Sequence, residues 1–378
     1  MIPDPVALAK ALIKEPSVTP ATGAVFDVCE AALTAAGFAV TRLTFDTHGT
    51  PVENLFAIAG ESGRHLTLAG HVDVVPPGPA DAWHHGPFAA AEADGILYGR
   101  GAQDMKGAVA AMIAAGAAWR AGGGAGRLSY LITGDEEGPA LDGTKPLAAW
   151  AAEHHPFDAA VVGEPTSRER FGDTIKVGRR GSLSAELTVT GRQGHVAYQE
   201  KADNPIPALL AIGAALNQPI DDGTDVFAPT NLEITSVDVA NPAHNVIPGA
   251  GTLRFNVRFN DRWTVAALKE ALAARIARAA PSATVELNWR AGHSDVFRTV
   301  DADLISRVSA AVRETTGITP ECTTGGGTSD ARFLKDYGPV VEFGAVGTTM
   351  HQVNEATPVD ELVALTKTYE AIIARVLA

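Results

Sequence analysis

The chain has 378 residues, of which 46% are hydrophobic and 20% are charged. This length exceeds the usual size of a single hydrophobic core, so we expect two domains, and the composition is that of a packed globular protein. The formal net charge of -14 argues against nucleic-acid binding, because phosphate contacts need clustered lysine and arginine side chains. The two cysteines, Cys29 and Cys322, are too few for a cysteine-based zinc site, so any metal ion would need histidine and carboxylate ligands.

The N-terminal sequence lacks the basic and apolar regions of a secretory signal. The most apolar stretch, residues 107–118, is interrupted by glycine and is well short of the roughly 20 residues that a bilayer requires. We therefore expect a cytoplasmic protein with no membrane partner.

Helical periods alternate with short apolar runs in the first half of the chain, which is typical of an α/β layer structure. The predicted helices cover residues 6–14, 24–36 and 108–119. The predicted strands cover residues 65–69, 128–133 and 159–162. Each strand ends directly before a polar or charged cluster. Because ligands bind outside the carboxyl ends of strands in open α/β sheets, these clusters form the candidate site.

The pattern changes between about residues 182 and 290. Strands are predicted over residues 184–190, 232–239, 252–259 and 284–289, with helices over 207–216 and 264–278. The order β-α-β-β-α-β is that of a ferredoxin-like unit. Helix and strand patterns of the first kind return at residues 304–315, 340–343 and 359–377. We therefore predict an α/β catalytic domain with a mixed sheet flanked by helices, formed by residues 1–180 and 294–378, and an inserted ferredoxin-like α+β domain at 181–293.

Histidine and carboxylate side chains follow the three strands predicted in the first half of the chain. The first strand leads to His71 and Asp73, the second to the acids at 135–137, and the third to Glu164. Each alone has a simpler interpretation, since a lone histidine is usually a hydrogen-bonded residue and an acidic loop is usually a solvated turn. Acids gathered at the end of a parallel sheet would repel one another, however, and a bound cation would relieve that repulsion.

Two further groups complete a candidate metal site. Asp104 stands in a glycine-containing loop before a predicted helix, where it could be a helix N-cap or a metal ligand, and His351 lies in a loop near the C-terminus. With Asp104, Glu137 and Glu164 ionised and one hydroxide bound, four negative charges would balance two divalent ions. Glu136 would then remain outside the coordination and could act as a base.

In sequence order, these side chains form one set: His71, Asp73, Asp104, Glu136, Glu137, Glu164 and His351. Their order and spacing resemble those of the di-zinc aminoacylase and carboxypeptidase family of hydrolases, and the resemblance covers essentially the whole chain. It implies an enzyme that hydrolyses a small N-acyl amino acid with two Zn²⁺ ions per subunit, for which Co²⁺ is an expected substitute. The alternative is a non-catalytic metal-binding protein with the same fold, which would have no use for Glu136.

The resemblance also implies how the ligands are shared. His71 and Glu164 would hold one ion, and Glu137 and His351 would hold the other. Asp104 and a water or hydroxide would bridge the two ions.

The catalytic residues implied by the resemblance are Glu136, Asp73 and His195. Glu136 would take a proton from the bridging water and pass it to the departing amine, while Asp73 orients the His71 ring. His195 resembles a histidine that reaches from the family's inserted domain into the partner subunit's active site and donates to the developing oxyanion. The inserted domain is therefore expected to act as a lid and to form a homodimer. The alternative for His195 is an ordinary surface histidine.

Three stretches, residues 178–182, 245–249 and 324–330, resemble family members that act on N-succinyl-LL-2,6-diaminopimelate. A succinyl carboxylate calls for guanidinium groups, and Arg179 and Arg258 are the arginines expected to bind it. The other substrate-binding residues implied by the resemblance are Tyr198, Asn245, Gly327 and Thr328.

The expected products are succinate and LL-2,6-diaminopimelate, as in lysine biosynthesis. Two features leave other substrates open, namely N-acetylornithine, a related N-acyl amino acid or a small peptide. Arg179 and Arg180 could instead be solvated charges at a domain hinge, and Gly347 stands where related sequences commonly have asparagine. A serine or cysteine nucleophile is disfavoured, because there is no G-x-S-x-G motif and neither cysteine lies in an activating context.

Overall fold

The computed structural model describes residues 1–290 and 292–378, and the chain divides into two compact units. Unit 1 consists of Met1–Gly178, Arg298–Thr323 and Ser329–Ala378, and unit 2 of Arg179–Phe297 and Thr324–Thr328. Each unit buries its own cluster of aliphatic and aromatic side chains. Among the described residues, no helix combines the length and the apolar character needed to cross a membrane.

Unit 1 is built on an eight-stranded sheet in the order β1-β2-β6-β3-β7-β18-β8-β17. Its strands are β1 (Ala39–Phe45), β2 (Val52–Ala59), β3 (His65–His71), β6 (Arg127–Thr133), β7 (Ala159–Val162), β8 (Thr174–Lys176), β17 (Glu321–Thr323) and β18 (Val340–Glu342). The neighbours β6, β3, β7 and β18 run parallel, whereas β2 runs antiparallel to both β1 and β6. The sheet is therefore mixed, as the sequence predicts.

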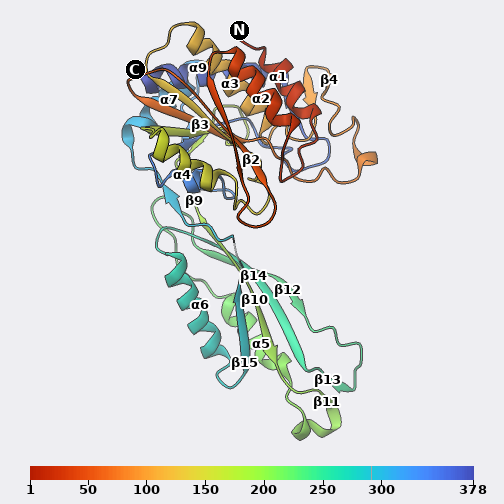
Figure 1. Ribbon diagram of the computed structural model, residues 1–378. Coiled ribbons are helices and arrows are strands. Elements are labelled where there is room, and N and C mark those ends of the chain that lie inside the picture. The colour runs from red at the N-terminus through yellow and green to blue at the C-terminus, as the bar shows by residue number, and fades with distance from the viewer. Residues whose placement is uncertain (291) are drawn as a thin grey trace. The chain divides into compact units, whose positions relative to one another are not determined.

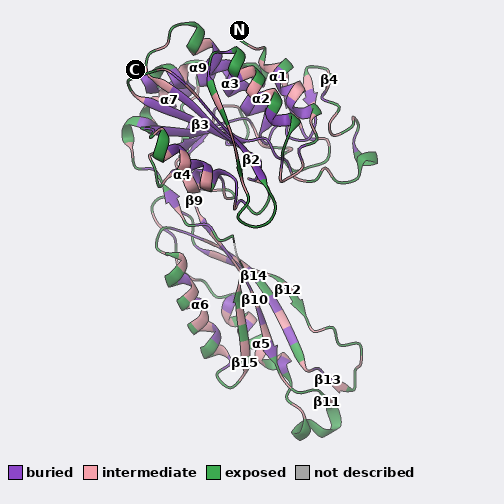
Figure 2. Cartoon of the chain, in the orientation of Figure 1, coloured by how far each residue is buried: buried purple, intermediate pink, exposed green. Residues whose placement is uncertain are grey.

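Helices flank this sheet (Figure 1). They are α1 (Pro5–Lys14), α2 (Ala24–Ala35), α3 (Lys106–Ala121), α4 (Thr144–His154), α7 (Ala302–Thr316), α8 (Ala331–Leu334) and α9 (Val359–Leu377). Helices α3 and α9 contact β3, and β3 is buried at every position (Figure 2), as expected for a parallel strand covered on both faces. Gly116 of α3 permits close packing, because a Cβ there would lie 1.8 Å from the Tyr130 hydroxyl oxygen.

Unit 2 contains a four-stranded antiparallel sheet in the order β12-β14-β10-β15. Its strands and helices are β10 (Gly181–Thr190), α5 (Pro205–Leu216), β12 (Asn231–Asp238), β14 (Ala250–Phe259), α6 (Val265–Ala279) and β15 (Thr284–Trp289). This is the ferredoxin-like order that the sequence predicts. Side chains along β10 alternate between buried and half-buried, and α5 contacts β10, β14 and α6, so one face of the sheet packs against the helices.

Shorter elements complete the chain. In unit 1, β4 (Ala91–Ala93), β5 (Ile96–Tyr98) and β19 (Ala356–Pro358) form a three-stranded sheet, and η1 (Ala80–Ala82) is a 3-10 turn. In unit 2, β11 (Gly194–His195) pairs with β13 (Val246–Ile247), and the 3-10 helix η2 (Val196–Lys201) follows β11. The short strands β9 (Gly178–Arg179) and β16 (Phe297–Arg298) lie where the chain passes from one unit to the other.

Candidate active site

Three parallel strands deliver predicted site residues to one edge of the unit 1 sheet. His71 is the last residue of β3 and pairs with Thr133, the last residue of β6. The last residue of β7, Val162, pairs with Ala69 of β3. The residues that follow β6 and β7 therefore lie beside His71, at the edge where ligands bind in open α/β sheets.

Five side chains gather there into two overlapping groups. Ligand atoms of His71, Asp104 and Glu164 lie within 4.8 Å of one another, and so do those of Asp104, Glu137 and His351. His71 Nε2 lies 3.1 Å from Asp104 Oδ1, and His351 Nε2 lies 3.2 Å from Asp104 Oδ2. Asp104 thus turns one carboxylate oxygen toward each histidine, as a bridging ligand would.

The remaining carboxylate of each group lies close to its own histidine. The distance is 3.8 Å between Glu164 Oε1 and His71 Nε2, and 2.8 Å between Glu137 Oε1 and His351 Nε2. Imidazole nitrogens and carboxylate oxygens are the usual ligands of zinc outside cysteine-rich sites. Across residues 1–290 and 292–378, every group of three or more side chains able to share an ion is drawn from these residues and Glu136.

Neighbouring carboxylates favour the protonated form of both histidines in the cluster. Hydrogen bonds to Asp104 and Glu137 raise the pKa of His351 to about 10. Burial disfavours the cation of His71, but hydrogen bonds to Asp104 and Asp73 raise its pKa well above the usual value. Two divalent ions would displace these protons and balance the same acids, so the donor set fits the metal pair that the resemblance implies.

Glu136 lies beside both groups without joining the pair that shares Asp104. Its carboxylate lies within 4.8 Å of ligand atoms of His71 and Glu137. Burial, followed by repulsion from Glu164, raises the pKa of Glu136 well above its usual value. A buried carboxylate beside the candidate metal ligands is placed to exchange a proton with a water or substrate bound there.

Asp104 does not cap the helix that follows it. Helix α3 begins at Lys106, and its N-cap residue, Met105, makes no side-chain capping hydrogen bond. The N-cap alternative for Asp104 is therefore wrong, and both of its carboxylate oxygens face histidines instead.

The His71 ring lies closer to the backbone carbonyl of Asp73 than to the Asp73 carboxylate, which was expected to orient it. His71 Nδ1 lies 2.9 Å from the Asp73 backbone carbonyl and 3.5 Å from its carboxylate. The two carboxylate oxygens accept hydrogen bonds from the backbone N–H groups of Glu136 and Glu137, at 3.2 and 3.0 Å. Asp73 is fully buried, so its carboxylate fixes the segment that carries Glu136 and Glu137.

Sequence reasoning missed a second buried carboxylate beside the cluster. Glu355 Oε1 accepts a hydrogen bond from the backbone N–H of Asp104 at 3.2 Å, and Glu355 Oε2 accepts one from Arg100 Nη1 at 2.6 Å. The sequence feature that could have indicated this carboxylate is Arg100, which stands between two glycines close before Asp104. A buried arginine at such a position would need an acidic partner.

One group of predicted substrate residues lies at one end of the unit 2 sheet. Gly181 of β10 pairs with Phe259 of β14, which places Arg179 and Arg258 near the same end. Arg179 Nη1 donates a hydrogen bond to the Gly327 carbonyl at 2.9 Å. Thr328, the next residue, is half-buried.

The second group lies at the opposite end of β14, where β11 and β13 pair. The rings of His195 and Tyr198 are exposed, with centroids 5.7 Å apart. The Asn245 carbonyl accepts a hydrogen bond from the Val196 N–H at 3.1 Å. Strand β14 has 10 residues, so at about 3.3 Å per residue the two groups are about 30 Å apart.

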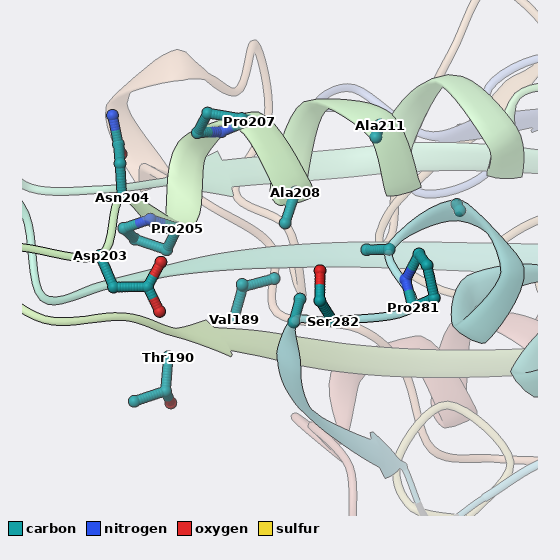
Figure 3. Close-up of a pocket in the computed structure, with 13 residues that line it drawn as sticks. Val189, Thr190, Asp203, Asn204, Pro205, Pro207, Ala208, Ala211, Pro281 and Ser282 are labelled. Carbon is teal, nitrogen blue, oxygen red and sulfur yellow. The ribbon is translucent and has the colours of Figure 1, made fainter. Parts of the chain in front are cut away.

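A pocket in unit 2 contains none of the predicted site residues (Figure 3). Asp203 and Asn204, at the start of α5, line one part of it, and Pro281 and Ser282, before β15, line another. The candidate active site therefore rests on the cluster in unit 1 and not on this pocket.

We predict that Asp73→Asn lowers kcat by about 10- to 100-fold, the range typical of residues that orient metal ligands. Asparagine can accept only one of the two backbone hydrogen bonds, so the segment that carries Glu136 and Glu137 should shift. Steady-state kinetics and metal content provide the measurement. The control is Asp158→Asn, which alters a carboxylate bound to the His65 N–H at the other end of β3. Equal kcat values for the two variants would contradict this role of Asp73.

Solved structures share the fold. An M20 family metallo-carboxypeptidase from Sulfolobus solfataricus matches with a TM-score of 0.80 at 16% identity, covering 99% of each chain. Human carnosine dipeptidase 1 matches with a TM-score of 0.77 at 19% identity, covering 99% of this chain and 96% of that one. A dinuclear metal binding peptidase of the M20 family from Bacillus subtilis matches with a TM-score of 0.73 at 16% identity, covering 99% of this chain and 97% of that one. These likenesses confirm the predicted fold class.

The sequence matches curated relatives along its whole length. Succinyl-diaminopimelate desuccinylase of Xanthobacter autotrophicus is 54% identical over 371 residues, which are 98% of each chain. The protein of the same name from Rhodopseudomonas palustris is 50% identical over 383 residues, covering 100% of this chain and 99% of the relative. The model of peptidase family M20/M25/M40 matches residues 67–375. The chain therefore belongs to peptidase family M20/M25/M40, in agreement with the resemblance seen in the order of its histidines and acids.

Proposed function

We propose that the chain hydrolyses N-succinyl-LL-2,6-diaminopimelate to succinate and LL-2,6-diaminopimelate, using two Zn²⁺ ions that Co²⁺ can replace. As a member of its family, it is a metal-dependent amidohydrolase. The observation that carries the proposal is the Asp104 carboxylate, which lies 3.1 Å from His71 and 3.2 Å from His351 and so joins two ligand groups. The substrate is proposed from relatives that are 54% and 50% identical and are named succinyl-diaminopimelate desuccinylases.

The chain's own groups would handle the protons of this reaction. When bound, the two ions would supply Lewis acidity toward the amide carbonyl and toward water. Glu136 accepts the proton of the attacking water and donates it to the leaving amine nitrogen. Asp73 holds Glu136 in place through the 3.2 Å bond to its backbone N–H.

Glu136→Gln is expected to lower kcat by at least about 100-fold, because an amide cannot accept the proton. Zinc content should stay at the wild-type value, since Glu136 lies outside the two groups that share Asp104. Both quantities are measured on the same samples, with Glu153→Gln on the exposed face of α4 as the control. Wild-type turnover by Glu136→Gln would show that Glu136 is not the base. Loss of zinc from this variant would show that Glu136 is a metal ligand.

The succinyl carboxylate is proposed to bind Arg179 and Arg258. Both arginines lie near the same end of the unit 2 sheet, and the Gly327 carbonyl holds the Arg179 guanidinium. Thr328 follows Gly327 in the sequence, and its hydroxyl is proposed as a further donor. A guanidinium group binds a carboxylate through two parallel N–H donors, and an acetyl group offers no such partner.

Gly347 offers no side chain to the substrate. A Cβ at this position would lie 3.2 Å from Pro165 Cβ and 3.3 Å from Met350 Sδ, so a larger residue would require its neighbours to move. Selectivity for a succinyl group is therefore proposed to depend on the arginines.

Purified protein should hydrolyse N-succinyl-LL-2,6-diaminopimelate with a kcat/KM at least about 100-fold above that for N-acetylornithine, because sites built to pair a polar group reject substrates that lack it. Arg179→Met should reduce this ratio, whereas Arg168→Met, at an exposed position, should leave it unchanged. A higher kcat/KM for N-acetylornithine would contradict the proposed substrate and leave the metal chemistry intact.

The proposal includes a homodimer formed through unit 2, which would also act as a lid. Strand β12 is an edge strand, and its Val237 is 54% exposed. On α5, Leu210 is 64% exposed. An unpaired strand edge can pair with a second chain, and the interface of such a dimer would cover these two apolar side chains.

The distance between the two groups of proposed substrate-binding residues in unit 2 supports a role for the partner subunit. His195, Tyr198 and Asn245 lie about 30 Å along the sheet from the two arginines, so a single small substrate cannot touch both groups of one chain. We therefore propose that His195 donates to the oxyanion in the partner's active site.

Mixing two inactive variants tests this arrangement. In a dimer of Glu136→Gln with His195→Ala, the second chain keeps its own Glu136 and receives an intact His195 from the first. If subunits exchange freely, the mixture should recover about a quarter of the wild-type rate, since half of the dimers carry one complete site. No recovery, with subunit exchange verified by mass-labelled chains, would contradict action across the dimer.

The cytoplasm is the proposed location. Cys29 and Cys322 are both free thiols, which suits a reducing compartment. Burial raises the pKa of the Cys29 thiol to about 12, so Cys29 is not suited to act as a nucleophile.

A further inference from the structure

A buried ion pair lies next to the candidate metal cluster, and neither of its residues is a candidate metal ligand. Arg100 Nη1 lies 2.6 Å from Glu355 Oε2, and the two side chains are 2% and 0% exposed. Burying two charges has a desolvation cost that their attraction often fails to repay. The contacts of the pair indicate what it contributes instead.

Glu355 anchors the loop that carries Asp104. Its Oε1 accepts hydrogen bonds from the backbone N–H groups of Gly101, Gln103 and Asp104, at 3.1, 3.0 and 3.2 Å. The Glu355 backbone carbonyl accepts another from the Gly99 N–H at 2.9 Å. One buried carboxylate thus fixes the backbone that delivers the shared ligand.

Arg100 holds the loop that carries His351. Its Nη1 donates to the Gln352 carbonyl at 3.1 Å, and its Nη2 donates to the His351 carbonyl at 3.4 Å. His351 has a φ of 63°, a conformation that residues other than glycine rarely adopt unless their surroundings impose it. The guanidinium also lies over the Trp83 ring, 5.3 Å from its centroid, which restricts its own position.

A second link joins the same two loops. Gln103 Oε1 accepts a hydrogen bond from the Thr349 N–H at 2.8 Å, and Gln103 is 3% exposed. His71 and Glu164 do not depend on these links. His71 belongs to β3, and the residue before Glu164, Gly163, donates its N–H to the Ala69 carbonyl of β3 at 3.0 Å.

We propose that Arg100 and Glu355 are positioning residues that set the spacing between Asp104 and His351, and thereby the affinity of the Asp104–Glu137–His351 group for a divalent ion. The His71–Asp104–Glu164 group depends less on Arg100, because the sheet supports two of its three ligands. This inference rests on the proposed two-metal function. It adds that the two ions are held by different means, one mainly by the sheet and the other by a buried guanidinium.

The test is to titrate chelator-treated protein with Co²⁺. Calorimetry and visible absorption measure the affinity of each of the two ions. Arg100→Lys keeps a positive charge beside Glu355 but loses the planar fork that reaches the carbonyls of His351 and Gln352. One Co²⁺ should bind with wild-type affinity within about threefold, and the other about 10- to 100-fold more weakly, as for other residues that orient ligands. Glu355→Gln should weaken the binding of both Co²⁺ ions, because Glu355 holds the backbone of the shared ligand Asp104.

Two controls separate positioning from general stability. Tyr130→Phe removes a buried hydrogen bond from the Tyr130 hydroxyl to the Met112 carbonyl, and it should lower the melting temperature of the metal-free protein without changing either Co²⁺ affinity. If Arg100→Lys fails to fold, Gln103→Met, which removes the bond to the Thr349 N–H, must show the same selective loss.

The outcomes for the inference and for the proposed function differ. Wild-type protein that binds fewer than two Co²⁺ ions would contradict the two-metal function itself. Wild-type protein that binds two ions, with Arg100→Lys retaining both affinities or losing both equally, would overturn the inference alone.

Discussion

Electrostatic repulsion among carboxylates at one edge of the unit 1 sheet is the constraint on which the site depends. Asp104, Glu136, Glu137 and Glu164 are brought together by the ends of β6 and β7 and by the loop before α3. Four carboxylates in so small a volume cannot all remain ionised without neighbouring cations. The pKa values of His71 and His351 are raised by these acids, which favours imidazolium cations beside them, and the proposed pair of divalent ions would balance the same charges.

Two buried carboxylates that are not ligands give this cluster its geometry. Asp73 accepts hydrogen bonds from the backbone of Glu136 and Glu137, and Glu355 does the same for the backbone of Asp104. Each fixes a loop through its N–H groups and leaves the side chains of that loop facing the site. The rigid strands therefore provide only part of the precision, and buried charges beside the strand ends provide the rest.

The sequence predicted the parts of the protein that are governed by local pattern. Strand β7 is apolar throughout and helix α9 has a clear helical period, and both were predicted with their observed bounds. Three candidate ligands, His71, Glu137 and Glu164, could be named because they lie at or shortly after the ends of such strands, whereas the candidates Asp104 and His351 lie in loops. Strand β1 was missed because none of its side chains is buried, so it has no apolar run. The role of Arg100 and Glu355 could not be predicted, because two charged residues separated by 255 positions reveal their pairing only in the folded chain.

The most direct test of the two-metal account is anomalous diffraction at the zinc absorption edge from crystals of the zinc-loaded protein. The account predicts two peaks, about 3.5–4 Å apart as in other two-metal hydrolases, on either side of the Asp104 carboxylate. One peak should lie beside His71 and Glu164, and the other beside Glu137 and His351. A single peak, or peaks remote from Asp104, would contradict it.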